Sequence, residues 1–163
     1  MDEPADESAL QHASRPGLQY AALPYRMTEE VEILLVTSRE TQRWVIPKGW
    51  PMKGRKPYAA AAREALEEAG VVGTIGKTPI GAYRYVKRLK NGAPLVCSVD
   101  VFALLVARQR RRWPEQHQRT AHWFPVAEAA AAVQEPELQD LIERFGRVLT
   151  AALLRPTSEA RPS

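Results

Sequence analysis

The sequence contains one cysteine, no long apolar run and only three histidines, and each of these scarcities excludes a class of protein. Because Cys97 has no partner in the chain, no internal disulfide forms, which favours a reducing compartment. No apolar stretch approaches the roughly 18 residues that a membrane-spanning helix needs, and the acidic start lacks the plan of a secretion signal. The histidines are scattered, without the paired spacing of a zinc site. We therefore expect a cytoplasmic protein that has no membrane partner.

The composition is that of a soluble domain whose positive charge lies after residue 16. The chain has 163 residues, of which 45% are hydrophobic and 26% are charged, so one domain with its own core is expected. The net charge is +4, but residues 1–16 contain four acidic side chains against Arg15 alone. The rest of the chain therefore carries a net charge of +7. This excess favours an anionic partner, with a solvated basic surface as the alternative.

Apolar patterning divides the chain into one domain over residues 17–152 and two polar ends. Residues 1–16 are expected to be a disordered acidic tail, and residues 153–163 a flexible C-terminal tail. The predicted strands cover residues 18–26, 31–39, 43–49, 74–89, 93–108 and 121–126, with a hairpin turn at 90–94. The predicted helices cover residues 57–69 and, in one or two pieces, 126–152. This order predicts an α/β fold of the α+β kind, with a mixed sheet sandwiched between helices.

Three glutamates lie on one face of the helix predicted at residues 57–69. Glu64, Glu67 and Glu68 are three and four residues apart, and residues at this spacing are neighbours on a helix surface. Like charges so placed destabilise a helix by ~0.2–0.5 kcal/mol per pair. Taken alone, the cluster is compatible with a solvated acidic face. The basic loop at residues 50–56 favours a second interpretation, in which the carboxylates hold a cation such as Mg²⁺ beside a polyanionic substrate.

The segment GWPMKGRKPYAAAAREALEEAGV, residues 49–71, resembles the Nudix box. That box consists of glycine, five residues, glutamate, seven residues, and then Arg-Glu-apolar-x-Glu-Glu-x-Gly-apolar. The matching positions are Gly49, Arg63, Glu64, Ala65, Glu67, Glu68, Gly70 and Val71. One position departs from the pattern, because Arg55 stands where the family has its first glutamate. Arg55 is then either an additional phosphate contact or a drifted surface residue.

The resemblance implies a Nudix fold, a metal-dependent pyrophosphohydrolase activity and a role for each of these residues. Glu64 and Glu68 are expected to bind Mg²⁺ or Mn²⁺, and Glu67 is expected to be a ligand or the proton acceptor. Arg63 is expected to hold the glutamates in place. The backbone carbonyl of Gly49 is expected to add a further metal ligand.

Outside the box, residues 36–126 resemble the diphosphoinositol polyphosphate phosphohydrolase branch of the family, which also cleaves diadenosine polyphosphates. The similar segments are RWVIPKG before the box, EEAGVVGTIG across its end, and WPEQHQRTAHWF at residues 113–124. The basic side chains expected to contact phosphate, in this branch and in the loop of the box, are Arg39, Lys48, Lys53, Arg55, Lys87, Arg88 and Arg119. The expected partner is thus a small-molecule polyphosphate, and we favour diadenosine polyphosphates or diphosphoinositol polyphosphates. Trp50 is expected either to stack on a purine or to brace the loop.

Other functions remain open at this point. One is a Nudix pyrophosphatase that acts on ADP-ribose or nucleoside triphosphates, and another is a non-catalytic Nudix domain that binds nucleotides or RNA. The intact glutamate trio argues against a loss of the chemistry. The segment ARQRRRW at residues 107–113 suggests nucleic acid, but the sequence lacks a pattern of stacking aromatics, so we do not expect this partner. The protein is expected to be a monomer or a homodimer.

Overall fold

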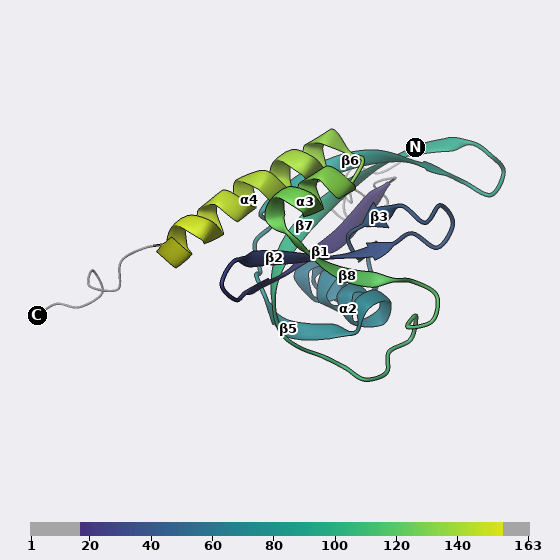
Figure 1. Cartoon of the computed structure of the whole chain (residues 1–163). Helices are drawn as coiled ribbons and strands as arrows, with labels where there is room; N and C mark the ends of the chain where they lie inside the picture. The colour runs from purple at the N-terminus through teal and green to yellow at the C-terminus, as the bar shows by residue number, and fades with distance from the viewer. Residues whose placement is uncertain (1–16, 155–163) are drawn as a thin grey trace, which may run out of the picture.

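Eight strands form one mixed sheet in the computed structural model, which describes residues 17–154 (Figure 1). The strands are β1 (Leu18–Met27), β2 (Val31–Thr37), β3 (Trp44–Val45), β4 (Lys48–Gly49), β5 (Val71–Ile75), β6 (Gly81–Arg88), β7 (Pro94–Gln109) and β8 (Ala121–Pro125). The path through the sheet is β3-β2-β1-β7-β5, with β4 beside β1, β6 beside β7 and β8 beside β2. Only the β1–β7 pairing among these strands is parallel, and it runs from Leu18 opposite Ser98 to Tyr25 opposite Leu105.

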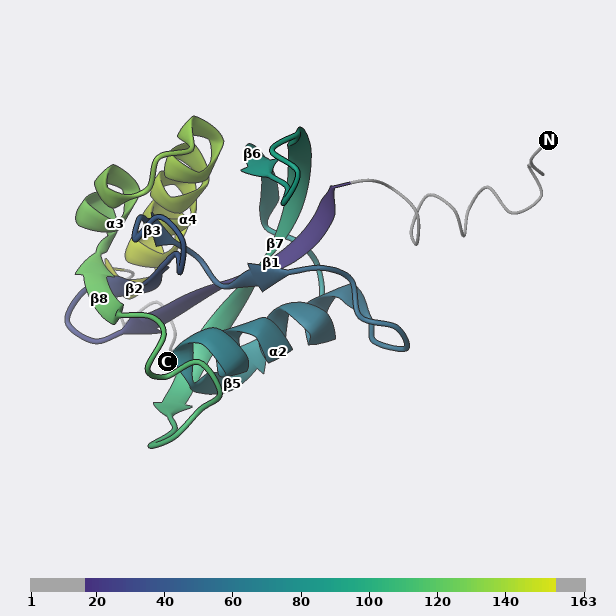
Figure 2. The ribbon, with the colours of Figure 1, turned by 90° about the vertical axis from the view of Figure 1, so that its right-hand side faces the viewer.

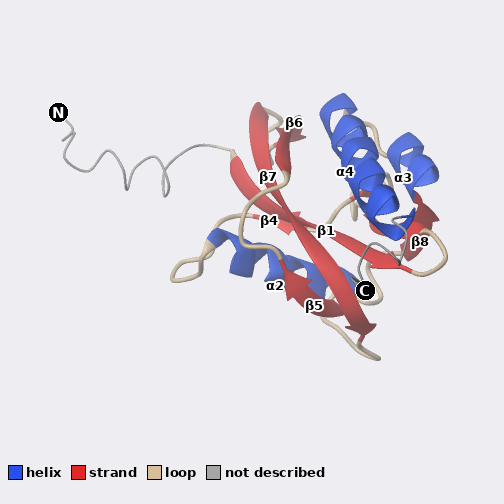
Figure 3. Ribbon diagram, turned by 90° about the vertical axis from the view of Figure 1, so that its left-hand side faces the viewer, coloured by secondary structure: helices blue, strands red, loops and turns tan. Residues whose placement is uncertain are grey.

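Helices cover both faces of this sheet, which confirms the predicted sandwich (Figure 3). The helix α2 (Pro57–Ala69) lies on one face, and α3 (Val126–Ala132) and α4 (Pro136–Leu154) lie on the other. Alternate residues of a strand point to opposite faces. In β2, Ile33 and Leu35 join the core under α3 and α4, whereas Leu34 and Val36 join the core under α2. Burial on both faces explains why the central strands are continuous apolar runs in the sequence.

The helix α2 has the bounds that the sequence predicts. Pro57 occupies its first turn, where a missing N–H is tolerated, and Gly70 ends it in the left-handed conformation with φ of 73°. The Gly70 N–H donates to the carbonyl oxygen of Leu66 at 3.0 Å. The face of α2 that packs on the sheet consists of alanines, namely Ala60, Ala61, Ala65 and Ala69. These small side chains let the helix lie close to the sheet, with its glutamates at the flank.

Two predicted strands are divided in the structure, whereas the predicted hairpin at residues 90–94 is confirmed by the pairing of β6 with β7. The expected strand at 43–49 becomes β3 and β4, because Pro47 has no N–H to donate. The expected strand at 74–89 is also wrong at its start, because β5 already begins at Val71 and ends at Ile75, and a separate strand β6 begins at Gly81. The two strands pair with different halves of the long strand β7.

The C-terminal helix extends slightly beyond the domain limit expected from the sequence. The helix α4 continues to Leu154, two residues beyond the expected end at residue 152. The predicted tails lie outside the described residues, apart from Leu153 and Leu154, which belong to α4. No helix in the described range 17–154 is long and apolar enough to cross a membrane.

Candidate active site

A polar cavity of about 280 Å³ lies between the sheet and the acidic flank of α2. Its lining residues are Gln19, Ser38, Arg39, Glu40, Val45, Lys48, Gly49, Trp50, Glu64, Glu68, Tyr85, Lys87, Glu115 and Arg119. They come from β1, the β2–β3 loop, β3, β4 and the residue after it, α2, β6 and the β7–β8 connection. Figure 2 shows this last connection running past the C-terminal end of α2, where the Glu115 N–H donates to the carbonyl oxygen of Glu67 at 2.9 Å. The fold thus gathers charged residues that are distant in the sequence.

Glu64 and Glu68, which we call the inner carboxylates, form the acidic wall of the cavity. Glu68 is only 6% exposed. Burial raises the pKa of Glu68 to about 8 from its ordinary value of 4.5, although the charges of Arg119 and Lys48 oppose this shift. Burial also raises the pKa of Glu64. Two carboxylates so placed favour a bound proton or cation over two uncompensated charges.

Gly49 lies directly against the carboxylate of Glu64. A Cβ atom added at Gly49 would lie 2.0 Å from Oε2 of Glu64, so any side chain here would displace that carboxylate. The position of Gly49 in the box therefore requires a residue without a side chain, because the Glu64 carboxylate occupies that space. It also brings the main chain of β4 to the acidic wall.

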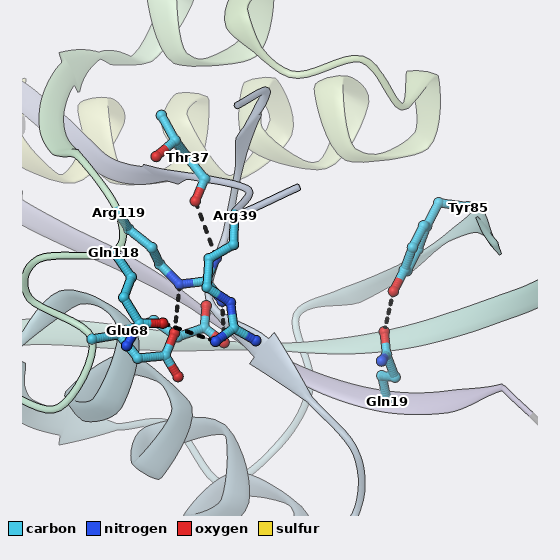
Figure 4. A network of polar contacts seen from close by, with 8 residues as sticks. Gln19, Thr37, Arg39, Glu68, Tyr85, Gln118 and Arg119 are labelled. Carbon is cyan, nitrogen blue, oxygen red and sulfur yellow. Dashed lines mark hydrogen bonds and ion pairs between the residues drawn. The ribbon is translucent and has the colours of Figure 1, made fainter. Parts of the chain in front are cut away.

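Arg119 links the acidic wall to β2 and to the β7–β8 connection (Figure 4). Its Nε donates to Oε1 of Glu115 at 2.7 Å, and its Nη1 donates to the carbonyl oxygen of Thr37 at 3.0 Å. Its Nη2 lies 3.7 Å from Oε2 of Glu68. The side chain of Arg119 is only 10% exposed, so these contacts fix it firmly. Arg119 therefore positions Glu68 and supplies a counter-charge to it.

The lining of the cavity also contains the cations Lys48, Lys87 and Arg39, which we call its cationic side. The Nζ of Lys48 lies 5.0 Å from the centre of the Tyr85 ring. The Tyr85 hydroxyl donates in turn to Oε1 of Gln19 at 2.7 Å (Figure 4). Lys48 thus lines the same cavity as the inner carboxylates, and the charge of Glu68 acts on it.

A further carboxylate lies behind Lys48. Glu135, in the connection between α3 and α4, has a buried Oε1 that accepts no hydrogen bond within the part of the chain that the structure describes. Its negative charge acts to raise the pKa of Lys48 and the pKa of Tyr85. Burial lowers the pKa of Lys48, and the charges of Glu68 and Glu135 oppose that shift. Glu135 thus favours the protonated form of a lysine that lies in the cavity.

Glu67 and Arg63 do not line the cavity. The Nε of Arg63 donates to Oε2 of Glu67 at 2.7 Å, and the side chain of Glu67 is 29% exposed. Consecutive residues of an α-helix are about 100° apart around its axis, so the side chain of Glu67 leaves the helix to one side of Glu68. The expected sharing of one face therefore extends to the cavity only for Glu64 and Glu68, while the charge of Glu67 still acts on Glu64. The structure therefore brings together the inner carboxylates and places the third glutamate beside them, where Arg63 orients it.

Four of the seven basic residues expected to contact phosphate line the cavity, and three do not. The four are Arg39, Lys48, Lys87 and Arg119, and the others are Lys53, Arg55 and Arg88, which are all exposed. Arg55 lines a separate groove together with Arg63, on another side of α2. The Nη1 of Arg88 donates to the carbonyl oxygen of Gly92 within the hairpin at 3.1 Å.

The structure adds Gln19, Tyr85, Glu115 and Glu135 to the site. They lie in four separate segments, and Glu115 and Glu135 are each surrounded by other polar residues, so no spacing within the sequence connects them with the box. Only Gln19 carries a visible signal, since it is a polar residue inside an apolar strand and is 4% exposed. The other three enter the site through strand pairing and through loop packing, which no local pattern encodes.

The donor set fits a hard divalent cation. No three His, Cys, Asp or Glu side chains within residues 17–154 lie close enough to form a metal-binding group by themselves. The inner carboxylates and the main chain of Gly49 nevertheless present oxygen donors at one wall of the cavity. Mg²⁺ is usually held by one or two carboxylates, while water and substrate phosphates complete its coordination. Because burial raises the pKa of Glu68, its ionised form lacks sufficient counter-charge, which a bound cation would supply.

Comparison with known proteins agrees with this geometry. The sequence model of the NUDIX domain matches residues 17–145, which include the cavity and α2. The chain belongs to the Nudix family. The protein is therefore a Nudix pyrophosphohydrolase, and Nudix hydrolases generally depend on a divalent metal.

Relatives of this Nudix hydrolase come from several branches. It is 31% identical to Nudix hydrolase 12, mitochondrial, of Arabidopsis thaliana over 144 residues, covering 78% of this chain and 71% of the plant protein. It is 32% identical to diphosphoinositol polyphosphate phosphohydrolase 3-alpha of Mus musculus over 117 residues, covering 70% and 67%. The structure of a C. elegans Ap4A hydrolase binary complex aligns with a TM-score of 0.62 at 22% identity, over 82% of this chain and 98% of that one. The last likeness concerns the fold alone.

Proposed function

We propose that this Nudix hydrolase cleaves a phosphoanhydride bond in a diadenosine polyphosphate or a diphosphoinositol polyphosphate, with Mg²⁺ or Mn²⁺ held at the inner carboxylates. One observation carries the proposal. One cavity of about 280 Å³ is lined both by the inner carboxylates and by the cations Arg39, Lys48 and Lys87. The acidic wall suits a cation, and the cationic side suits a chain of phosphates. The names of the mouse relative and of the C. elegans neighbour agree with this class of substrate.

Each group of residues has a task in this proposal. Glu64, Glu68 and the carbonyl of Gly49 hold the cation, which when bound neutralises charge on the phosphates. Arg119 keeps Glu68 in position through the contacts described above. Glu67 accepts the proton of the attacking water, and Arg63 orients its carboxylate through the 2.7 Å hydrogen bond. General-base catalysis of this kind contributes roughly 10²–10⁴-fold to the rate.

The cationic side favours a substrate with more than two phosphates. Arg119 is engaged by Glu115 and Thr37, which leaves Arg39, Lys48 and Lys87 to contact phosphates. A charge-assisted hydrogen bond contributes roughly 1.5–3 kcal/mol. Two contacts beyond those that a two-phosphate substrate makes would raise kcat/KM by on the order of 10²-fold or more.

Trp50 favours a dinucleotide over an inositol substrate. Its ring lies in the cavity lining and is 43% exposed, so it offers a stacking face to a purine. An inositol ring has no π-face to meet it. We therefore propose the diadenosine polyphosphates as the first choice.

The experiment is a comparison of kcat/KM across a panel of substrates with Mg²⁺ and with Mn²⁺. The panel contains diadenosine penta- and hexaphosphate, a diphosphoinositol polyphosphate, ADP-ribose and a nucleoside triphosphate. The polyphosphates should exceed ADP-ribose by on the order of 10²-fold, and added salt should narrow the gap because exposed phosphate contacts are screened. Trp50→Ala should reduce kcat/KM for the dinucleotides and leave that for the inositol substrate unchanged.

Two results would contradict the proposal. If ADP-ribose or a nucleoside triphosphate has the highest kcat/KM, the protein is a Nudix pyrophosphatase of another specificity. If no substrate turns over while nucleotides still bind, it is a binding domain. The cytoplasmic location stays a prediction, which fractionation of the native cells would check.

A further inference from the structure

Four exposed arginines gather where β7 ends and the β7–β8 connection begins. Arg108, Arg110, Arg111 and Arg112, which we call the arginine surface, border an open hollow of about 610 Å³ together with Gln109. None of these residues lines the catalytic cavity. They have no role in the proposed hydrolysis.

The four arginines lie together and have no acidic partners, whereas five arginines elsewhere in the described chain are paired with carboxylates. Arg26, Arg63, Arg84, Arg119 and Arg144 each form an ion pair with a glutamate or an aspartate. Within residues 17–154, no ion pair or side-chain hydrogen bond involves the guanidinium groups of the arginine surface. Each guanidinium therefore keeps its five N–H donors available to a ligand. Four like charges within five residues also produce a strong local positive potential.

The backbone that carries these side chains is held in place. The Arg110 N–H donates to the carbonyl oxygen of Gly70 at 2.7 Å, and Nε2 of Gln116 donates to the carbonyl oxygen of Arg111 at 2.9 Å. The ring of Trp113 packs so closely on Gly70 that an added Cβ there would lie 2.3 Å from it. The pairing of Val72 with Arg108 anchors the other end. A ligand then orders side chains only, which lowers the entropic cost of binding.

We propose that the arginine surface binds the phosphate backbone of single-stranded nucleic acid. Guanidinium groups bind phosphate oxygens in a bidentate way, and a flexible single strand can bring successive phosphates to closely spaced arginines. The lining of the hollow contains no apolar side chain, whereas a protein interface has an apolar core. Trp113 packs on Gly70, so the surface has no base-stacking platform and binding is independent of sequence. The missing aromatic pattern, which argued against nucleic acid at first, excludes base recognition and not backbone binding.

The experiment measures fluorescence anisotropy of a labelled oligouridylate of about 12 nucleotides, a length within the range of single-strand binding sites. For single strands, log K falls by ~0.7 per phosphate contact for each unit of log salt, so four contacts give a slope of about −3. Replacement of all four arginines by glutamine should weaken binding by about tenfold or more and bring the slope close to zero. Hydrolysis of the small substrate should be unchanged, because the cavity is intact.

Two further variants control the result. Lys56, Lys77, Lys90 and Arg147 are exposed cations elsewhere that form no ion pair within residues 17–154, and their replacement by glutamine makes the same change in net charge. This control should stay within about twofold of the unaltered protein if the arginine surface binds locally. Replacement of the four arginines by lysine keeps the charge and removes the bidentate geometry, so it should retain the salt slope and lose a few-fold in affinity. This variant also covers the case in which the glutamine variant fails to fold.

Three outcomes would overturn the inference. The first is an absence of binding by the unaltered protein at low salt. The second is an equal loss in the control variant, because binding would then follow net charge. The third is competition by poly-glutamate as strong as that by unlabelled oligouridylate, which would indicate an acidic protein partner. The inference is independent of the proposed hydrolysis, so either can fail alone.

Discussion

Glu67 and Glu68 are consecutive residues of α2, yet their surroundings differ in burial, partner and charge. Glu68 faces the cavity at 6% exposure, and burial raises its pKa to about 8. The side chain of Glu67 is 29% exposed and accepts a hydrogen bond from Arg63 at 2.7 Å. The turn of about 100° per residue gives one short segment two carboxylate environments.

This difference suggests how one helix divides the work of hydrolysis. A buried carboxylate with a raised pKa is costly to ionise unless a cation lies beside it, which suits a metal ligand. A partly exposed carboxylate held by an arginine can exchange protons with water, which suits a proton acceptor. Each carboxylate also has its own cationic neighbour, which is Arg119 for Glu68 and Arg63 for Glu67.

The strongest test of this division is Glu67→Gln, which keeps the size of the side chain and removes its charge. We expect kcat to fall by at least ~10²-fold, the scale of one general base. The melting temperature of the metal-free protein should not fall by more than a few degrees, because exposed ion pairs contribute only ~0–1 kcal/mol. Stopped assays at saturating metal and a thermal melt measure the two effects. Glu143→Gln, at an exposed glutamate of α4, is the matched control, and near-normal turnover in Glu67→Gln would refute the role.

Removal of an inner carboxylate should act on the metal instead. In Glu68→Gln, and likewise in Glu64→Gln, the concentration of Mg²⁺ needed for half-maximal activity should rise by on the order of tenfold or more. High Mg²⁺ should restore much of the activity in these variants but not in Glu67→Gln. Titration of activity against Mg²⁺ measures this contrast. If all three variants respond to Mg²⁺ alike, Glu67 and the inner carboxylates do not differ in function.

The raised pKa of Glu68 predicts how the metal-free protein responds to pH. Between pH 4.5 and about 8, folded Glu68 retains a proton that the unfolded chain has released. The free energy of unfolding should therefore fall as the pH rises through this window, by on the order of 4 kcal/mol, or roughly 8–16 °C in melting temperature. Glu68→Gln should be less dependent on pH, and so should the protein with Mg²⁺ bound. Thermal melts in the presence of a chelator from pH 5 to pH 8.5 test this prediction. Parallel plots of melting temperature against pH for the unaltered protein and for Glu68→Gln would contradict it.

Much of the fold follows from local patterns in the sequence. Pro57 and Gly70 fix the ends of α2, and the apolar runs at 18–26 and 31–39 become β1 and β2 because both faces of the sheet are covered. The division of the strand predicted at 74–89 was missed. It depends on β7 being long enough to pair with two partners, which is a property of the assembled sheet.

The site was predictable where its residues share one helix, and less so elsewhere. The spacing of the glutamates leads to α2, and helical rotation then separates Glu67 from the inner carboxylates. Glu115 and Arg119 reach the cavity through the β7–β8 connection, whose path depends on contacts such as that between Trp113 and Gly70. Such contacts join distant segments, so spacing within the sequence does not reveal them.

The smallest effect is expected from Arg55→Ala, the substitution at the position where the box departs from its family. Arg55 is exposed and lines the groove on the side of α2 that carries Arg63, not the cavity. Because salt screens an exposed charge that lies outside the cavity, we expect KM in Arg55→Ala to change by less than about twofold for every substrate. Lys87→Ala, at a cation in the cavity lining, should raise KM for diadenosine hexaphosphate several-fold more than KM for ADP-ribose. The ratio of the two KM values in each variant is the measurement. A rise in this ratio for Arg55→Ala equal to that for Lys87→Ala would show that a long phosphate chain reaches around α2, and that cations on both of its sides recognise the substrate.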